Sequence, residues 1–253
     1  MVFMEITVLG SGTSGGIPEP GCTCPVCRSD NPKNKRTRCS VLVRSDNISV
    51  LIDTATEFRL QAIRENIDHI DAVLLTHTHA DHVSGLDDIR NFTRRNPVPV
   101  YGSRETIREI RERFGYIFRE TQTGGGKPRI ILSAMDSPVD INGLTAEPIP
   151  VRHGNLDVLA YRIGGFAYAT DCNSIPEESL RRLKDLDLLI IDGLKQTPHE
   201  THFSIPEALE IIRILKPKKA LLTHFCHRVD HAVLEKELPD NVEPAYDGLK
   251  III

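Results

Sequence analysis

The run Thr76-His77-Thr78-His79-Ala80-Asp81-His82 constrains this chain more than any other stretch of its sequence. It places three imidazoles and one carboxylate within the six positions from His77 to His82. Imidazole and carboxylate groups are ligands for hydrolytic metals such as zinc and manganese. Four such groups this close together rarely arise for packing alone, although a solvated polar loop is the ordinary alternative. The run therefore predicts a metal site.

The stretch before this run indicates how its side chains converge. The apolar, strand-like Ala72–Thr76 leads directly into His77. Because strand side chains alternate with period two, His77 and His79 lie on one face. Asp81 and His82 follow where the chain turns into the next helix. All four groups are expected just past a strand end, a position that often holds catalytic groups.

Three further potential ligands each come after a strand-like run. They are His153 after Ile149–Val151, Asp171 after Phe166–Thr170, and His224 after Ala220–Thr223. Each alone would be read as an ordinary surface or core residue. Their repeated placement after strands, together with the first run, predicts that they complete a site for one or two metals.

The rest of the chain predicts an α/β fold of one domain, residues 1–253, because no linker or repeat divides it. Further strand-like runs are Glu5–Leu9, Ser40–Arg44, Ile48–Asp53, Arg129–Leu132, Leu144–Pro148, Val158–Ile163, Leu186–Asp192 and Lys219–Thr223. Helical patterns cover Phe58–Glu65, Glu105–Phe114, Pro176–Leu183 and Pro206–Leu215. Two mixed sheets with helices outside would bury these elements in layers.

Charge and hydropathy limit the classes of partner. The net charge of −4 argues against a broad nucleic-acid-binding face. No apolar run approaches the roughly 20 residues that span a bilayer. Met1–Ser11 lacks the features of a signal peptide, so we expect a cytoplasmic protein that does not bind membranes.

A second metal signal is Cys22-x-Cys24-x-x-Cys27, in a loop at about residues 18–39. Three thiolates this close lack one ligand of a tetrahedral zinc site, and a metal would hold the loop in place. Without an export signal, clustered cysteines indicate metal binding rather than disulfides. The fourth ligand is expected to be His227, with Cys226 as the competing choice, while Cys39 packs at a strand start.

The pattern His77-x-His79-x-Asp81-His82, followed by His153, Asp171 and His224, resembles the metallo-β-lactamase superfamily over roughly residues 4–231. The resemblance implies an αββα sandwich. It also implies that His77, His79 and His153 bind one metal, that Asp81, His82 and His224 bind a second, and that Asp171 bridges them. Lactam-cleaving members commonly have cysteine at the bridging position, and Cys172 is adjacent. We favour Asp171, since a carboxylate suits phosphodiester hydrolysis.

The cysteine loop, His227 and the glycine-rich Val8–Pro18 resemble one branch, the phosphoribosyl 1,2-cyclic phosphate phosphodiesterases of phosphonate breakdown. This resemblance implies two catalytic divalent metals, manganese or zinc, one structural zinc, a small phosphorylated sugar substrate and a homodimer. A hydroxide bridging the metals would attack phosphorus, with Asp81 and His202 as catalytic residues. His199 is the alternative to His202.

Two residues outside the ligand pattern are candidates for supporting roles. Asp53 ends the strand Val50–Ile52, where it could orient a metal-bound histidine or simply cap a turn. Arg90, one helix past the first run, could pair with a substrate phosphate. Lys33, Lys35, Arg36 and Arg38 are expected to form a solvated face.

Other functions predict different features. A tRNA 3′-processing nuclease of the same superfamily carries a long flexible arm, and Thr121–Lys127 is too short for one. Members that act in cofactor biosynthesis share similar zinc loops and remain an alternative. A metal-stabilised binding protein without catalysis would have lost Asp81, Asp171 or a site histidine, and all are present.

Overall fold

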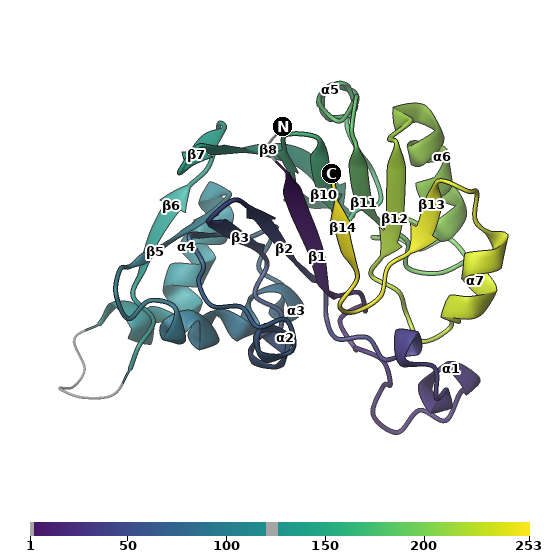
Figure 1. Ribbon diagram of the computed structural model, residues 1–253, viewed down its shortest axis with the longest axis horizontal. Coiled ribbons are helices and arrows are strands. Elements are labelled where there is room, and N and C mark those ends of the chain that lie inside the picture. Colours follow the sequence, from purple (N-terminus) through teal and green to yellow (C-terminus); the bar gives the residue numbers. More distant parts are fainter. Residues whose placement is uncertain (1–2, 120–125) are drawn as a thin grey trace.

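The computed structural model describes residues 3–119 and 126–253. The first two residues of Met1–Ser11 and residues 121–125 of Thr121–Lys127 therefore lie outside it. The described residues form two seven-stranded sheets. Figure 1 shows α2 (Phe58–Arg64) and α4 (Arg104–Arg113) beside one sheet, and α6 (Ile205–Leu215) and α7 (His231–Glu237) beside the other. This confirms the predicted arrangement of two mixed sheets with helices outside.

The first sheet combines an antiparallel and a parallel half. Its strands, in spatial order, are β14 (Lys250–Ile252), β1 (Met4–Gly10), β2 (Ser40–Ser45), β3 (Ile48–Ile52), β4 (Ala72–Leu74), β5 (Val98–Gly102) and β6 (Ile130–Ala134). The pairs from β3 to β6 are parallel, and those from β14 to β3 are antiparallel. The carboxyl ends of β3 and β4 therefore lie at the same edge.

The second sheet repeats this plan. Its strands, in spatial order, are β13 (Val242–Pro244), β12 (Lys219–Thr223), β11 (Leu188–Asp192), β10 (Phe166–Ala169), β9 (Leu156–Ile163), β8 (Leu144–His153) and β7 (Val139–Ile141). The pairs from β10 to β13 are parallel. The short helix α5 (Glu177–Arg182) connects β10 to β11.

Both sheets are covered on two faces, which explains their continuous apolar strands. In β3, Val50 and Ile52 face the core between the sheets, whereas Leu51 packs with Phe58 of α2. In β11, Leu188 and Ile190 face the same central core, while the alternate residues pack against α6. Because side chains alternate across a strand, a strand between two layers must be apolar at every position.

The two sheets are joined close to the predicted metal site. The Tyr161 hydroxyl of β9 donates to the Leu75 carbonyl at 2.7 Å, and the Leu159 amide donates to the Thr76 carbonyl at 3.1 Å. These bonds hold the end of β4 against the second sheet, directly before His77. Among the described residues, no helix has the length and apolar character to cross a membrane.

Several short elements were not predicted. They are β5, β7, β13, β14, α7, the four-residue α1 (Pro25–Arg28) inside the cysteine loop, and the 3₁₀ helices η1 (Pro32–Asn34), η2 (Ser84–Asn91) and η3 (Gly115–Phe118). The short helix α3 (Ala80–Val83) carries Asp81 and His82. Proline in β5 and β13 argues against a strand in sequence, but tertiary pairing overrides it. Arg36 is also buried, so its predicted solvated position is wrong.

Candidate metal centre

Three of the predicted histidine ligands have Nδ1 held by a neighbouring oxygen. The contacts are His77 Nδ1 to Thr76 Oγ1 at 3.0 Å, His82 Nδ1 to Asp53 Oδ2 at 2.7 Å, and His153 Nδ1 to the Thr201 carbonyl at 2.7 Å. An Nδ1–H donated to an oxygen leaves the lone pair on Nε2. The Nε2 atoms of His77 and His82 are buried without a hydrogen-bond partner among the described residues. Such atoms suit a metal ion.

The ligand atoms form two groups, each with its members within 4.8 Å of one another. One group is His77, His79, His153 and Asp171, and the other is Asp81, His82, Asp171 and His224. These are the two sets that the resemblance implied. All but His79 are buried, so the centre opens to solvent at one histidine.

Asp171 belongs to both groups, and its two oxygens face different ones. Oδ1 lies 3.2 Å from Nε2 of both His82 and His224, whereas Oδ2 lies 3.9 Å from Nε2 of His77. Cys172 belongs to neither group; its buried Sγ lies 3.6 Å from the Ala169 carbonyl. The structure therefore favours Asp171 over Cys172 as the shared ligand.

The backbone turns sharply at three residues of the centre. Asp53, Asp171 and His224 have φ values of 62°, 51° and 62°, in the left-handed region. Asp53 directly follows β3, and His224 directly follows β12. Asp171 directly follows the apolar run Phe166–Thr170, which contains β10. This conformation costs a non-glycine residue about 1–2 kcal/mol, and such strain clusters at functional sites.

The carboxylates and imidazoles of the centre shift one another's ionisation. Burial alone would raise the pKa of Asp171, but the imidazoles of His224 and His82 outweigh it and hold that pKa well below the usual range. Burial alone would lower the pKa of His224, but Asp171 and Asp81 raise it to about 9. Without metal, protons on imidazole balance the carboxylates, and a cation would take their place.

Asp53 supports His82 from a fully buried position. Besides His82, it accepts hydrogen bonds from the Thr76 amide at 2.8 Å and the Thr76 hydroxyl at 2.9 Å. The carboxylate thus fixes the tautomer of His82 and the start of the metal-binding run. This is the orienting geometry that the sequence analysis expected for Asp53.

Replacing Asp53 by Asn should weaken binding of the metal held by Asp81, His82 and His224 by about 10–100-fold. The amide keeps the shape but cannot accept the same hydrogen bonds. Calorimetric titration of metal-depleted protein with Mn²⁺ would measure the change. Asp71→Asn is the matched control, because Asp71 also accepts a backbone hydrogen bond, from Ser49 at 2.8 Å. Equal metal affinity in both variants would contradict an orienting role.

His202 lies beside the ligands in a buried position. Its ring stacks on His224, with ring centroids 4.7 Å apart and planes at 16°, and lies 4.6 Å from the ring of His153. Its Nδ1 lies 2.7 Å from Asp192 Oδ2. His199 is exposed and contacts Thr201. The geometry therefore favours His202 over His199 as the proton donor.

Asp192 is a site residue that the sequence analysis did not single out. It is fully buried, and the same Oδ2 accepts the Cys172 amide at 3.0 Å. The sequence signal that could have identified Asp192 was its place at the end of the buried strand β11, much as Asp53 follows β3.

Arg90 was singled out in the sequence analysis. It pairs with Asp87 at 3.2 Å and contacts no metal ligand among the described residues, so its pairing with a substrate phosphate stays a prediction.

The cysteine loop forms a separate cluster of Cys22, Cys24, Cys27 and His227, with Cys226 outside it. The Sγ atoms of Cys22 and Cys27 lie 3.2 and 3.9 Å from His227 Nδ1. Cys24 caps α1, and its Sγ accepts the Cys27 amide at 3.4 Å. Burial raises the pKa of Cys27 to about 11, so this thiol keeps its proton until a cation displaces it.

The cluster is linked to the larger centre through the segment after β12. His224 and His227 are three positions apart, with Phe225 and Cys226 between them. The buried guanidinium of Arg36 lies 4.7 Å from the centre of the Phe225 ring and donates to the Val229 carbonyl at 2.9 Å. Phe225 also exchanges backbone bonds with Ser11 and Thr13. The segment that positions His224 is therefore held by the chain around the cysteine loop.

Comparison with known proteins gives one family and several relatives. A model described as "Beta-lactamase superfamily domain" matches residues 49–225. A crystal structure of "a New Diphosphatase from the PhnP Family" is 39% identical, covers 99% of this chain and 97% of its own, and has a TM-score of 0.93. Zn²⁺-bound PqqB from Methylobacterium extorquens, at 20% identity and a TM-score of 0.77 over 98% and 99% of the two chains, supports the fold alone.

A curated relative from Porphyromonas gingivalis carries the name octanoyltransferase. It is 41% identical over 258 aligned residues, which cover 99% of this chain and 52% of the relative. The chain thus spans about half the length of that relative, and it covers 40% of a coenzyme PQQ synthesis protein B from Methylobacterium radiotolerans.

Proposed function

Because this chain belongs to the metallo-β-lactamase superfamily, we propose that it is a metal-dependent hydrolase that opens a cyclic ribose phosphate of the phosphoribosyl 1,2-cyclic phosphate type. The observation that carries the proposal is Asp171, which turns one oxygen toward each of two histidine-rich ligand groups. Two closely spaced divalent metals, manganese or zinc, suit phosphodiester cleavage.

The residues present fit such a pair of metals. Each group offers imidazole nitrogens and carboxylate oxygens, and the Nε2 atoms of His77 and His82 lack another partner among the described residues. When bound, two metals would polarise the phosphoryl oxygens and activate water at neutral pH. Cys22, Cys24, Cys27 and His227 would hold one structural zinc.

His202 is suited to protonate the leaving sugar oxygen. Asp192 holds its Nδ1, which leaves Nε2 for proton transfer. The ring borders His153 and His224, one from each ligand group. A carboxylate that orients the histidine is the arrangement found behind many catalytic imidazoles.

The 39% identity to the diphosphatase supports phosphate chemistry and raises a second candidate, hydrolysis of a diphosphate bond. Both reactions break a phosphorus–oxygen bond and differ in the leaving group. We do not assign octanoyl transfer to this chain, because the match covers about half of the relative that has that name.

A substrate panel tests the proposal. Protein loaded with Mn²⁺ or Zn²⁺ would be assayed on phosphoribosyl 1,2-cyclic phosphate, a nucleoside diphosphate, bis(p-nitrophenyl) phosphate, a β-lactam and an octanoyl thioester. The highest kcat/KM is expected for the cyclic phosphate. A preference for the diphosphate would establish the second candidate. Turnover of only the lactam or the thioester would overturn both.

His202→Ala should lower kcat on the cyclic ribose phosphate by about 10²–10⁴-fold, the usual contribution of general acid catalysis. The loss should be much smaller on bis(p-nitrophenyl) phosphate, because p-nitrophenolate leaves without protonation. His199→Ala is the matched control and should change neither rate by more than about threefold. An equal loss on both substrates would show that His202 does not act as the acid.

A further inference from the structure

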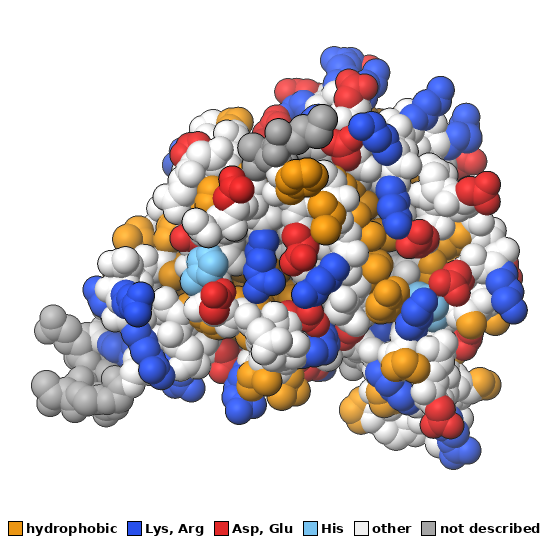
Figure 2. All heavy atoms as spheres, in the orientation of Figure 1, with side chains coloured by type: hydrophobic (Ala, Val, Ile, Leu, Met, Phe, Trp, Pro, Cys, Tyr) orange, Lys and Arg blue, Asp and Glu red, His pale blue; other side chains and the backbone are white. Residues whose placement is uncertain are grey.

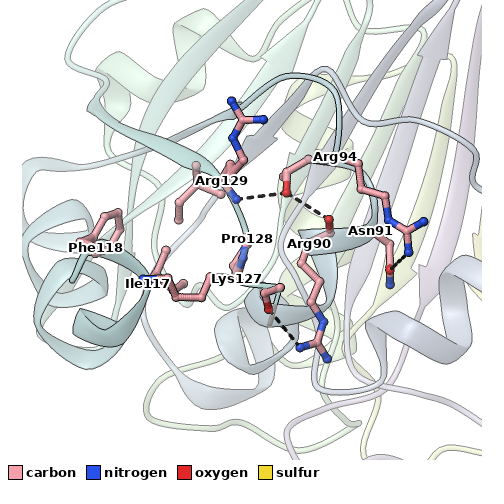
Figure 3. Close-up of a pocket in the computed structure, with 11 residues that line it drawn as sticks. Arg90, Asn91, Arg94, Ile117, Phe118, Lys127, Pro128 and Arg129 are labelled. Atoms are coloured by element: carbon pink, nitrogen blue, oxygen red, sulfur yellow. Dashed lines mark hydrogen bonds between the residues drawn. The ribbon is translucent and has the colours of Figure 1, made fainter. Parts of the chain in front are cut away.

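A cavity outside the metal centre has a volume of about 720 Å³, a size typical of small-molecule sites. We call it the basic cavity, because Arg90, Arg94, Lys127 and Arg129 line it. Ile117 and Phe118 form part of an apolar wall (Figure 3). None of its described lining residues belongs to a cluster of potential metal ligands.

The basic cavity lies at a different edge of the first sheet from the metal centre. Arg94 comes before β5 and Arg129 directly before β6, at the amino ends of two parallel strands. The ligands His77, Asp171 and His224 follow carboxyl ends of parallel strands. Arg90 is also separated from His82 by most of η2, whose eight residues extend about 16 Å at the 3₁₀ rise. A ligand in this cavity would therefore not replace the reacting group at the metals.

Among the described residues, the charge of the basic cavity is largely unbalanced. Four of its described lining residues are cationic, and no described lining residue is Asp or Glu. Arg90 pairs with Asp87, but the described contacts of the other three are to neutral oxygens. The Arg94 side chain donates to Asn91 Oδ1 at 3.3 Å, and that of Arg129 donates to the Arg95 carbonyl at 3.5 Å. Lys127 Nζ donates to the Tyr116 carbonyl at 3.3 Å and to the Arg119 carbonyl.

This local excess of positive charge contrasts with the net charge of −4 of the chain. Figure 2 shows several Lys and Arg side chains at the left end of the face it presents, and others along its top and upper right. A concave site lined by one sign of charge attracts ligands of the opposite sign. Guanidinium groups also match phosphate oxygens in geometry.

The arrangement of the cations favours an extended anion. In Figure 3 the side chains of Arg90, Arg94 and Arg129 extend in different directions around the cavity and do not converge on one point. A single phosphate could contact one or two of them, whereas a chain of phosphates could contact several. We propose that the basic cavity binds an oligophosphate, either free or as part of a nucleotide whose apolar surface rests on Ile117 and Phe118.

Isothermal titration of the full-length, metal-loaded protein tests this inference independently of the proposed activity. The probes are inorganic tripolyphosphate and adenylyl imidodiphosphate, a non-hydrolysable nucleotide. The double variant Arg94→Gln/Arg129→Gln should bind both at least about tenfold more weakly than the unmodified protein, since it loses charged hydrogen-bond donors. Tighter binding of the nucleotide than of tripolyphosphate would identify the nucleotide as the source.

The control variant is Arg181→Gln/Arg213→Gln, which removes two exposed arginines away from the basic cavity. Arg181 pairs with Glu177 within α5, and Arg213 pairs with Glu210 within α6. It has the same net charge as the cavity variant and should bind both probes like the unmodified protein. Both variants bear exposed substitutions, and thermal unfolding would confirm that they fold. Equal affinity in the two variants would place binding elsewhere, for example at the metals, and would overturn the proposal. Absence of saturable binding below about 1 mM would also overturn it.

Discussion

Asp171→Asn is expected to lower kcat/KM for bis(p-nitrophenyl) phosphate by roughly 10³-fold, which corresponds to about 4 kcal/mol of transition-state stabilisation. The amide keeps the shape of the carboxylate but removes the charge. Its NH₂ group would also face one of the two ligand groups that Asp171 Oδ1 and Oδ2 now serve. Steady-state rates at several Mn²⁺ concentrations, with metal content by elemental analysis, would measure the effect.

The control for this substitution is Asp185→Asn. Asp185 is exposed and also has a left-handed backbone, with φ of 56° against 51° at Asp171, so it reproduces the same change at the same conformation away from the metals. Its activity should match that of the unmodified protein. If Asp171→Asn retained activity within about threefold and bound both metals, Asp171 would not be the shared ligand.

Cys24→Ser is expected to remove one equivalent of zinc and to lower the free energy of unfolding by at least about 3 kcal/mol. The loop's own hydrophobic cluster is small, because it contains Ile17, Val26 and Cys27 with Cys22 and Cys24 beside them. Serine is a good N-cap, so the capping of α1 by residue 24 is retained and the test isolates the thiolate. Urea denaturation and zinc analysis would measure both effects.

Cys226→Ser provides the matched control. Cys226 lies next to His227 but outside the cluster, so its loss should leave zinc content and stability nearly unchanged. Reduced zinc in this variant would show that Cys226 is a ligand and would contradict the assignment of His227 as the fourth one. Because His224 lies three residues before His227, Cys24→Ser is also expected to weaken metal binding at the larger centre.

Much of the fold could be predicted from the sequence because its signals are local. The long strands appear as apolar runs, since both faces of each sheet are covered, and Ser204 begins α6 with a capping box that also involves Glu207. The elements that were missed are short or contain proline. In β5 and β13 their pairing is stabilised by neighbouring strands, which no local pattern records.

The ligand residues could likewise be identified from their chemistry and their places after strands. Roles that depend on a distant partner could not. Arg36 looked solvated because its neighbours in sequence are charged, yet it is buried against Phe225. Arg90 is close to the metal run in sequence but lines a different cavity.

The sequence by itself determined which side chains can bind metal, because the identity and spacing of His, Asp and Cys are properties of the chain. Only the tertiary structure decided that Asp171 rather than Cys172 faces both ligand groups, that Asp192 holds His202 and that His202 rather than His199 borders the centre. Those outcomes depend on backbone direction at strand ends and on contacts between two sheets. Residues far apart in the sequence meet there only when the chain has folded.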